Sequence, residues 1–112
     1  MEVAEMSFPV GSKWLIERQG GDDQTISVTE SNPPHFSAKY VGIANDSTFT
    51  GEVCTRQVDM LSLRQQHDEL RYTAFHIGSR QGERDEFVGA YGDVANGYSG
   101  RFRLVLIPAG SS

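Results

Sequence analysis

The chain has 112 residues, which is enough for one domain with a hydrophobic core and too few for two. Hydrophobic residues make up 38% of it and charged residues 22%, values that argue against a largely disordered or fibrous protein. The net charge is −5, and the Lys and Arg residues are scattered. This argues against nucleic acid as a partner, because nonspecific binding to nucleic acid depends on neutralising phosphates.

The N-terminal pattern is not that of a secretory signal. Residues 1–10 contain acidic residues where a signal has basic ones, and they lack an apolar stretch. The longest apolar run, 104–107, is far shorter than the ~20 residues of a membrane helix. We therefore expect a cytoplasmic protein, or a secreted chain after removal of its signal, with no membrane partner. Residues 1–10 are predicted to be a flexible segment, 11–108 the domain and 109–112 a tail.

Segments of alternating polar and apolar residues, rich in β-branched and aromatic side chains, predict eight β-strands. The strands are bounded by Gly, Pro, Asn or Asp, which favour turns. In the first half of the chain the predicted strands are Ser12–Gln19, Thr25–Ser31, His35–Val41 and Thr48–Thr55. In the second half they are Val58–Gln65, Leu70–Gly78, Glu86–Gly92 and Gly100–Ile107.

The connection between the fourth and fifth predicted strands lacks typical turn residues. Arg56-Gln57 would have to form it without Gly, Asn or Pro. Val58 and Leu61 also fall at helical spacing. A short helix within residues 58–69 is therefore kept as an alternative to the fifth strand.

Short turns between consecutive strands predict antiparallel pairing, and eight hairpin-linked strands favour closure because a closed barrel has no exposed edges. Four strands repeat a large, any, small, any, large pattern, which places a small residue between two bulky ones on one face. Such a pattern bends a strand and leaves room inside a narrow barrel. It occurs in Phe36–Tyr40, Phe49–Val53, Tyr72–His76 and Phe87–Tyr91. The predicted fold is all-β, an antiparallel eight-stranded up-and-down β-barrel without a long helix.

Alternation also assigns the two faces of each strand. The predicted interior comprises Trp14, Ile16, Ile26, Val28, Phe36, Ala38, Tyr40, Phe49, Gly51, Val53, Leu61, Leu63, Tyr72, Ala74, His76, Phe87, Gly89, Tyr91, Phe102, Leu104 and Leu106. The opposite face is mostly polar, but it also carries Leu15, Phe75, Ile77, Val88, Ala90, Val105 and Ile107. An outward apolar patch on neighbouring strands is typical of an association surface. We therefore predict a homo-oligomer with an interface at Phe75, Ile77, Val88, Val105 and Ile107.

Several short motifs resemble those of the avidin-like and wider calycin barrels. They are the opening Gly11-Ser-Lys-Trp14 and the strand motifs Ala38-Lys-Tyr40, Gly89-Ala-Tyr91 and, as a degenerate copy, Gly51-Glu-Val53. This resemblance implies an eight-stranded barrel that binds a small molecule at its open end.

The biotin contacts of the avidin family do not carry over. Ile16 stands where the family has an Asn two residues after the first Trp, and Gln19-Gly20-Gly21 stands where it has a Ser. Trp14 is the only tryptophan, and the last strand lacks the family's ligand-bonding Asp. The resemblance therefore implies a fold and a ligand-holding end, but not a biotin site.

No catalytic or metal motif stands out. Cys54 is the only cysteine, which excludes an intramolecular disulfide and a cysteine-rich zinc site. No Gly-x-Ser-x-Gly motif occurs, and His67-Asp68-Glu69 on a turn would make a poor metal cage. We therefore predict no catalytic residue, no metal and no cofactor. His76, on the predicted interior face, is interpreted either as bonded to a backbone carbonyl or as a ligand contact.

Barrel mouths combine apolar walls with a few orienting polar groups. The predicted ligand-binding residues are Trp14, Tyr40, Arg64, Tyr72, His76 and Tyr91. The competing interpretation is that these side chains simply plug the barrel. The first functional hypothesis is non-enzymatic binding of a small organic molecule or sugar at one end. The alternative is a protein-interaction module, such as an inhibitor, immunity or assembly protein, that uses the outer apolar face. A calycin-like enzyme is the third.

Overall fold

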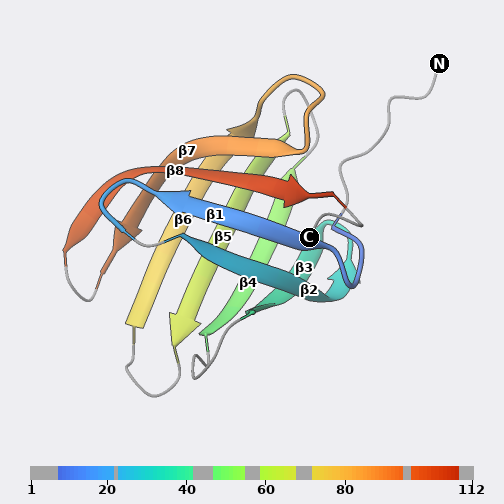
Figure 1. Ribbon diagram of the computed structural model, residues 1–112, viewed down its shortest axis with the longest axis horizontal. Helices are drawn as coiled ribbons and strands as arrows, with labels where there is room; N and C mark the ends of the chain where they lie inside the picture. The colour runs from blue at the N-terminus through green and yellow to red at the C-terminus, as the bar shows by residue number, and fades with distance from the viewer. Residues whose placement is uncertain are drawn as a thin grey trace.

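The computed structural model describes residues 8–21, 23–41, 47–54, 59–67, 72–94 and 97–108. Eight antiparallel strands follow one another around a closed barrel, and the last pairs with the first (Figure 1). They are β1 (Lys13–Arg18), β2 (Gln24–Asn32), β3 (His35–Tyr40), β4 (Ser47–Cys54), β5 (Met60–His67), β6 (Tyr72–Arg80), β7 (Glu86–Asp93) and β8 (Tyr98–Ile107). The predicted fold class is therefore confirmed.

The fifth element, for which the sequence left a strand and a short helix as alternatives, is a strand. β5 pairs with β4 and with β6 along its whole length, which excludes a helix over Met60–His67. Leu61 and Leu63 point into the barrel and alternate with exposed neighbours, so burial selects the two-residue period over the helical one. The predicted turn at Arg56-Gln57 lies outside the described residues.

The side chains that were predicted to face inward fill the barrel. Those buried there are Trp14, Ile16, Ile26, Val28, Phe36, Ala38, Phe49, Val53, Leu61, Leu63, Ala74, His76, Phe87, Tyr91, Phe102 and Leu104. Tyr40 and Leu106 are partly buried and pack against this core. The side chain of Tyr72 lies outside the described part of the chain.

The small residues of the repeated pattern make room for neighbouring groups. A Cβ added to Gly51 would lie 2.2 Å from Cζ of Phe36, its register partner on β3. A Cβ on Gly89 would lie 1.9 Å from the carbonyl oxygen of Ile77 on β6. Both distances are far below van der Waals contact, so these positions require glycine for close packing.

The barrel has two chemically different ends. At the end where β1 begins and β8 finishes, Phe8 inserts its ring into the core from outside the strands. Its ring centroid lies 3.9 Å from that of Phe36 and 4.4 Å from that of Trp14. Phe8 belongs to the segment that the sequence placed before the domain, yet it is only 3% exposed. This end is therefore closed by stacked aromatic rings.

Candidate functional site

Polar side chains gather at the opposite end, where β1, β5 and β7 finish and β2, β4 and β6 begin. Arg18, the last residue of β1, is at the centre of this group. Its Nε donates to Nε2 of His76 at 2.9 Å, its Nη1 to Oε1 of Gln24 at 2.9 Å and its Nη2 to Oε1 of Gln65 at 2.5 Å. One guanidinium group thus links β1 to β2, β5 and β6.

Gln65 extends this network across the barrel. Its side chain is only 3% exposed, because it follows Leu61 and Leu63 on the inner face of β5. Its Nε2 donates to Oγ of the buried Ser47 at 3.1 Å and to Oε1 of Gln24 at 3.3 Å. We refer to Arg18, Gln24, Ser47, Gln65 and His76 as the Arg18 network.

His76 is held as one neutral tautomer. Arg18 can only donate, so Nε2 of His76 must accept, and the proton lies on Nδ1. Nδ1 then donates to the carbonyl oxygen of Leu63 at 3.0 Å. Burial and the positive charge of Arg18 lower the pKa of His76 to about 4, although the bond to Leu63 acts in the opposite direction. At neutral pH His76 is therefore an uncharged acceptor for Arg18.

Aromatic rings flank the Arg18 network. The ring of Tyr91 stacks against His76 at 5.9 Å between centroids, and the guanidinium carbon of Arg18 also lies 5.9 Å from the Tyr91 centroid. The hydroxyl of Tyr91 donates to the backbone carbonyl of Gln19 at 2.8 Å. Phe102 meets the His76 ring edge-on at 5.2 Å. Asp93, the last residue of β7, is also buried at this end.

Two of the six predicted ligand-binding residues, His76 and Tyr91, meet at this end. Tyr40 lies at the end of β3 and packs partly buried against the core. Trp14 lies near the opposite end under Phe8, and its Nε1 donates to Oγ of Ser12 at 3.1 Å. For Tyr72 the structure describes only the backbone, within β6.

Arg64, the sixth predicted residue, is exposed on the outer wall, where it donates to Gln66 at 2.6 Å. The inward position belongs to Gln65 because it continues the alternation of Leu61 and Leu63. The sequence prediction also missed Arg18, which continues the inward series of Trp14 and Ile16. The signal was present in the strand period, but Arg18 and Gln65, at the ends of their apolar series, were not assigned to the interior.

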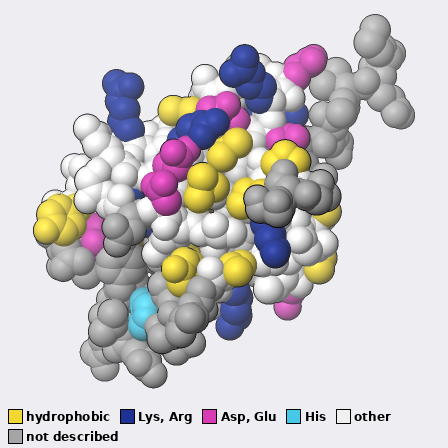
Figure 2. Space-filling model, viewed as in Figure 1, with side chains coloured by type: hydrophobic (Ala, Val, Ile, Leu, Met, Phe, Trp, Pro, Cys, Tyr) yellow, Lys and Arg dark blue, Asp and Glu magenta, His cyan; other side chains and the backbone are white. Residues whose placement is uncertain are grey.

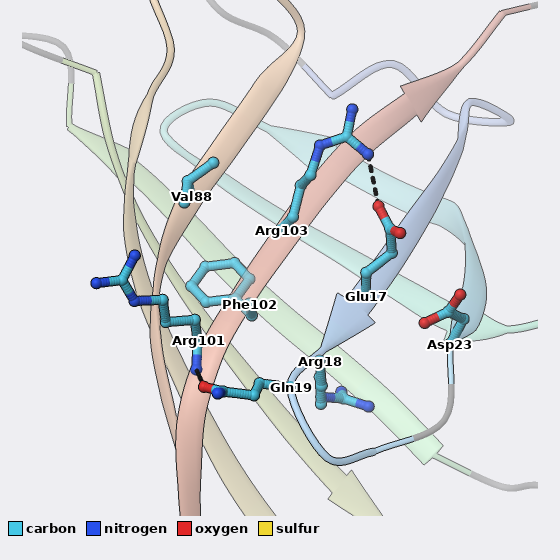
Figure 3. A pocket seen from close by; sticks show the side chains of 8 residues that line it. All are labelled: Glu17, Arg18, Gln19, Asp23, Val88, Arg101, Phe102 and Arg103. Carbon is cyan, nitrogen blue, oxygen red and sulfur yellow. Dashed lines mark hydrogen bonds and ion pairs between the residues drawn. The ribbon is translucent and has the colours of Figure 1, made fainter.

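The outer wall carries a shallow depression of about 380 Å³ over β1 and β8. Figure 3 shows Glu17 and Arg103 directed at each other across it. Arg103 bonds to Glu17 at 2.5 Å and to Glu86 at 2.6 Å, and these bonds raise its pKa. Its partners come from β1 and β7, so this ion-pair row ties together three neighbouring strands.

The ion-pair row divides the predicted apolar interface. In Figure 2 basic and acidic side chains lie between the hydrophobic ones on the face toward the viewer. Phe75 and Ile77 on β6 are 46% and 60% exposed. The other three predicted interface residues, Val88, Val105 and Ile107, are partly buried. The strand register places Arg103 beside Val88 and Glu86 beside Val105, so charged side chains separate these two apolar positions.

Among the described residues no group of three or more His, Cys, Asp or Glu side chains is placed to hold a metal ion. The same part of the chain contains no helix long and apolar enough to cross a membrane.

Comparisons with protein-family models, with curated proteins and with solved structures found no match for this chain.

Proposed function

We propose that this chain is a non-enzymatic binding protein that holds a small organic molecule at the polar end of its barrel. The observation that carries the proposal is the Arg18 network. Its five side chains come from five different strands and converge at the end opposite Phe8. Convergent polar groups beside apolar walls at a barrel mouth are typical of ligand sites.

The free energy of folding does not by itself account for these polar groups. Burying Gln65, Ser47 and His76 requires a hydrogen bond for each polar atom, whereas apolar side chains would fill the same space without that cost. The other end is in fact closed by apolar rings around Phe8. This contrast supports recognition, rather than closure alone, as the role of the network.

The chemistry of the network favours a ligand with acceptor oxygens. Arg18 is permanently charged, and its planar guanidinium group suits a carboxylate. The side-chain amide of Gln24 suits hydroxyl groups as well, and Gln65 holds Arg18 and Gln24 in place from the buried side. His76 adds no charge of its own at neutral pH because its pKa is about 4. We therefore infer that the ligand is a small organic acid or a sugar.

The avidin-like and calycin resemblance supports the same proposal at the level of architecture. Barrels of that kind hold small molecules at an open end, and the present barrel has the same strand number and closure. Since the biotin contacts are missing from the sequence, the proposed ligand is not biotin.

The proposal is tested with a panel of small organic carboxylates and monosaccharides. Thermal shift identifies compounds that stabilise the protein, and calorimetry measures their affinity. We expect R18Q and Q65L to weaken binding by about tenfold or more, the scale of a lost charge-assisted hydrogen bond.

The matched control is R64Q, which removes an exposed arginine next to Gln65 but outside the Arg18 network. It should bind as the parent does, and circular dichroism should show the same β-structure in all variants. A panel without one stabilising compound would contradict the proposal. Equal weakening by R64Q would contradict the assignment to the network.

A further inference from the structure

Three of the exposed large apolar side chains of the barrel wall lie on and beside β6. Ile77 is 60% exposed, Phe75 46% and Met60, on β5, 41%. Ala90 and Val88 continue this surface on β7, where they are the register partners of Ile77 and Ser79. We refer to these five apolar residues as the β6 face. An outward-facing group of apolar side chains on neighbouring strands is typical of a protein interface.

Charged residues border the β6 face in an ordered way. The strand register places one row of outward residues across five strands, from β4 to β8, with Ile77 at its centre. In order, the row is Glu52, Ser62, Ile77, Ala90 and Arg101. All five are exposed. An acid and a base thus stand two strands from β6, on opposite sides of it.

This arrangement complements itself. Suppose that two barrels meet face to face about a twofold axis that runs along β6. β5 of one copy then faces β7 of the other, and β4 faces β8. Glu52 then faces Arg101 of the second copy, and Arg101 faces its Glu52. Ile77 and Phe75 lie on the axis and face their own copies. An axis across the strands through Ile77 would instead oppose Glu52 to Glu52 and Arg101 to Arg101, so charge selects the axis along β6.

The two adjacent rows fit the same axis. In the row of Ser79, Met60 lies on one side and Val88 on the other, so apolar side chains face each other. In the row of Phe75, Arg64 lies opposite Gly92 of the second copy. The space above Gly92 is open, since nothing lies within 4 Å of where its Cβ would be. The long Arg64 side chain therefore meets a gap rather than a clash.

The shape of the barrel agrees with this pairing. A closed barrel curves away from any line along its wall, so the gap between two barrels widens with distance from β6. The positions one strand away carry the small Ser62 and Ala90, whereas those two strands away carry the long Glu52 and Arg101. We propose that two copies of this chain associate through the β6 face, about a twofold axis along β6.

The first test measures the mass of the full chain by sedimentation equilibrium. The expected mass is twice the 12.4 kDa of the chain at micromolar concentration. I77E places two carboxylates on the axis and should give the monomer mass. V10E, which introduces the same charge at an apolar position 64% exposed outside the face, should leave the dimer intact.

The second test exchanges charges. E52R should weaken the dimer by about tenfold or more, because each introduced arginine would face Arg101 of the other copy. The double variant E52R/R101E restores opposite charges and should restore the parent dissociation constant. Circular dichroism on each variant separates loss of association from loss of fold.

Three results would overturn this proposal: a parent that is monomeric at all concentrations, a dimer that survives I77E, or a double variant no tighter than E52R. Capture of a different protein by a monomeric chain would instead favour a partner other than a second copy. None of these results depends on the ligand proposed for the polar end, because β6 directs His76 inward and Phe75 and Ile77 outward.

Discussion

Protonation of His76 should destabilise the folded chain. In the fold Nε2 of His76 accepts from Arg18, so a second ring proton would remove that hydrogen bond and place two cations together inside the barrel. Burial of the ring and the positive charge of Arg18 are the reasons why the pKa of His76 falls from 6.5 to about 4. As the pH falls through 6.5 the unfolded chain takes up the proton first, and the folded chain follows only near pH 4.

The contribution of neutral His76 to the free energy of unfolding is therefore complete above pH 6.5 and is lost progressively between pH 6.5 and pH 4. At about 1.4 kcal/mol for each pH unit, the loss amounts to about 3 kcal/mol. Urea unfolding at several pH values from 7.5 to 4 measures it. The free energy of unfolding of H76Q should fall by about 3 kcal/mol less than that of the parent over this range.

The control is H35Q, which removes an exposed histidine outside the Arg18 network. The difference between the two variants isolates His76 from the carboxylates that also titrate in this range. Parallel pH dependences of the parent and H76Q would refute the reasoning. If H76Q does not fold, an NMR titration of the His76 ring in the parent gives the same answer, and a midpoint near 6.5 would refute it.

Two further predictions concern packing. F8A removes the stacked ring that closes the apolar end and should lower the free energy of unfolding by about 3–5 kcal/mol, whereas V10A, at an exposed position, should change it little. G51A should cost about 1–3 kcal/mol, because the added Cβ would meet the buried ring of Phe36. G92A is its control, since nothing lies within 4 Å there. Chemical denaturation measures all four variants, and equal losses in G51A and G92A would disprove the packing argument.

The strands of the barrel were predictable from the sequence because each is identified by the pattern of residues within its own segment. Side chains in a strand alternate with a period of two, so the apolar positions of each segment identify the strand and its inner face. Trp14 and Ile16, or Leu61 and Leu63, required no knowledge of the rest of the chain. The resemblance to calycin-type barrels added the expectation of a ligand-holding end.

The same period, carried to the strand ends, would have placed Arg18 and Gln65 inside. The prediction stopped short because a charged or amide side chain next to solvent is usually exposed. Arg64 was included as an orienting polar group, although alternation places it on the outer wall. The predicted position was wrong by one residue, and a shift of one residue along a strand moves a side chain from the inner to the outer face.

The sequence alone therefore determined the eight strands, their order and their two faces, since each follows from residues close together along the chain. Only the tertiary structure decided which inward groups meet. Arg18 reaches His76 across 58 residues and Gln65 across 47. Phe8 closes the core from outside the strands, and Glu52 and Arg101 share a row only through the register of four strand pairs. Contacts of this kind depend on closure and register, which a local pattern does not encode.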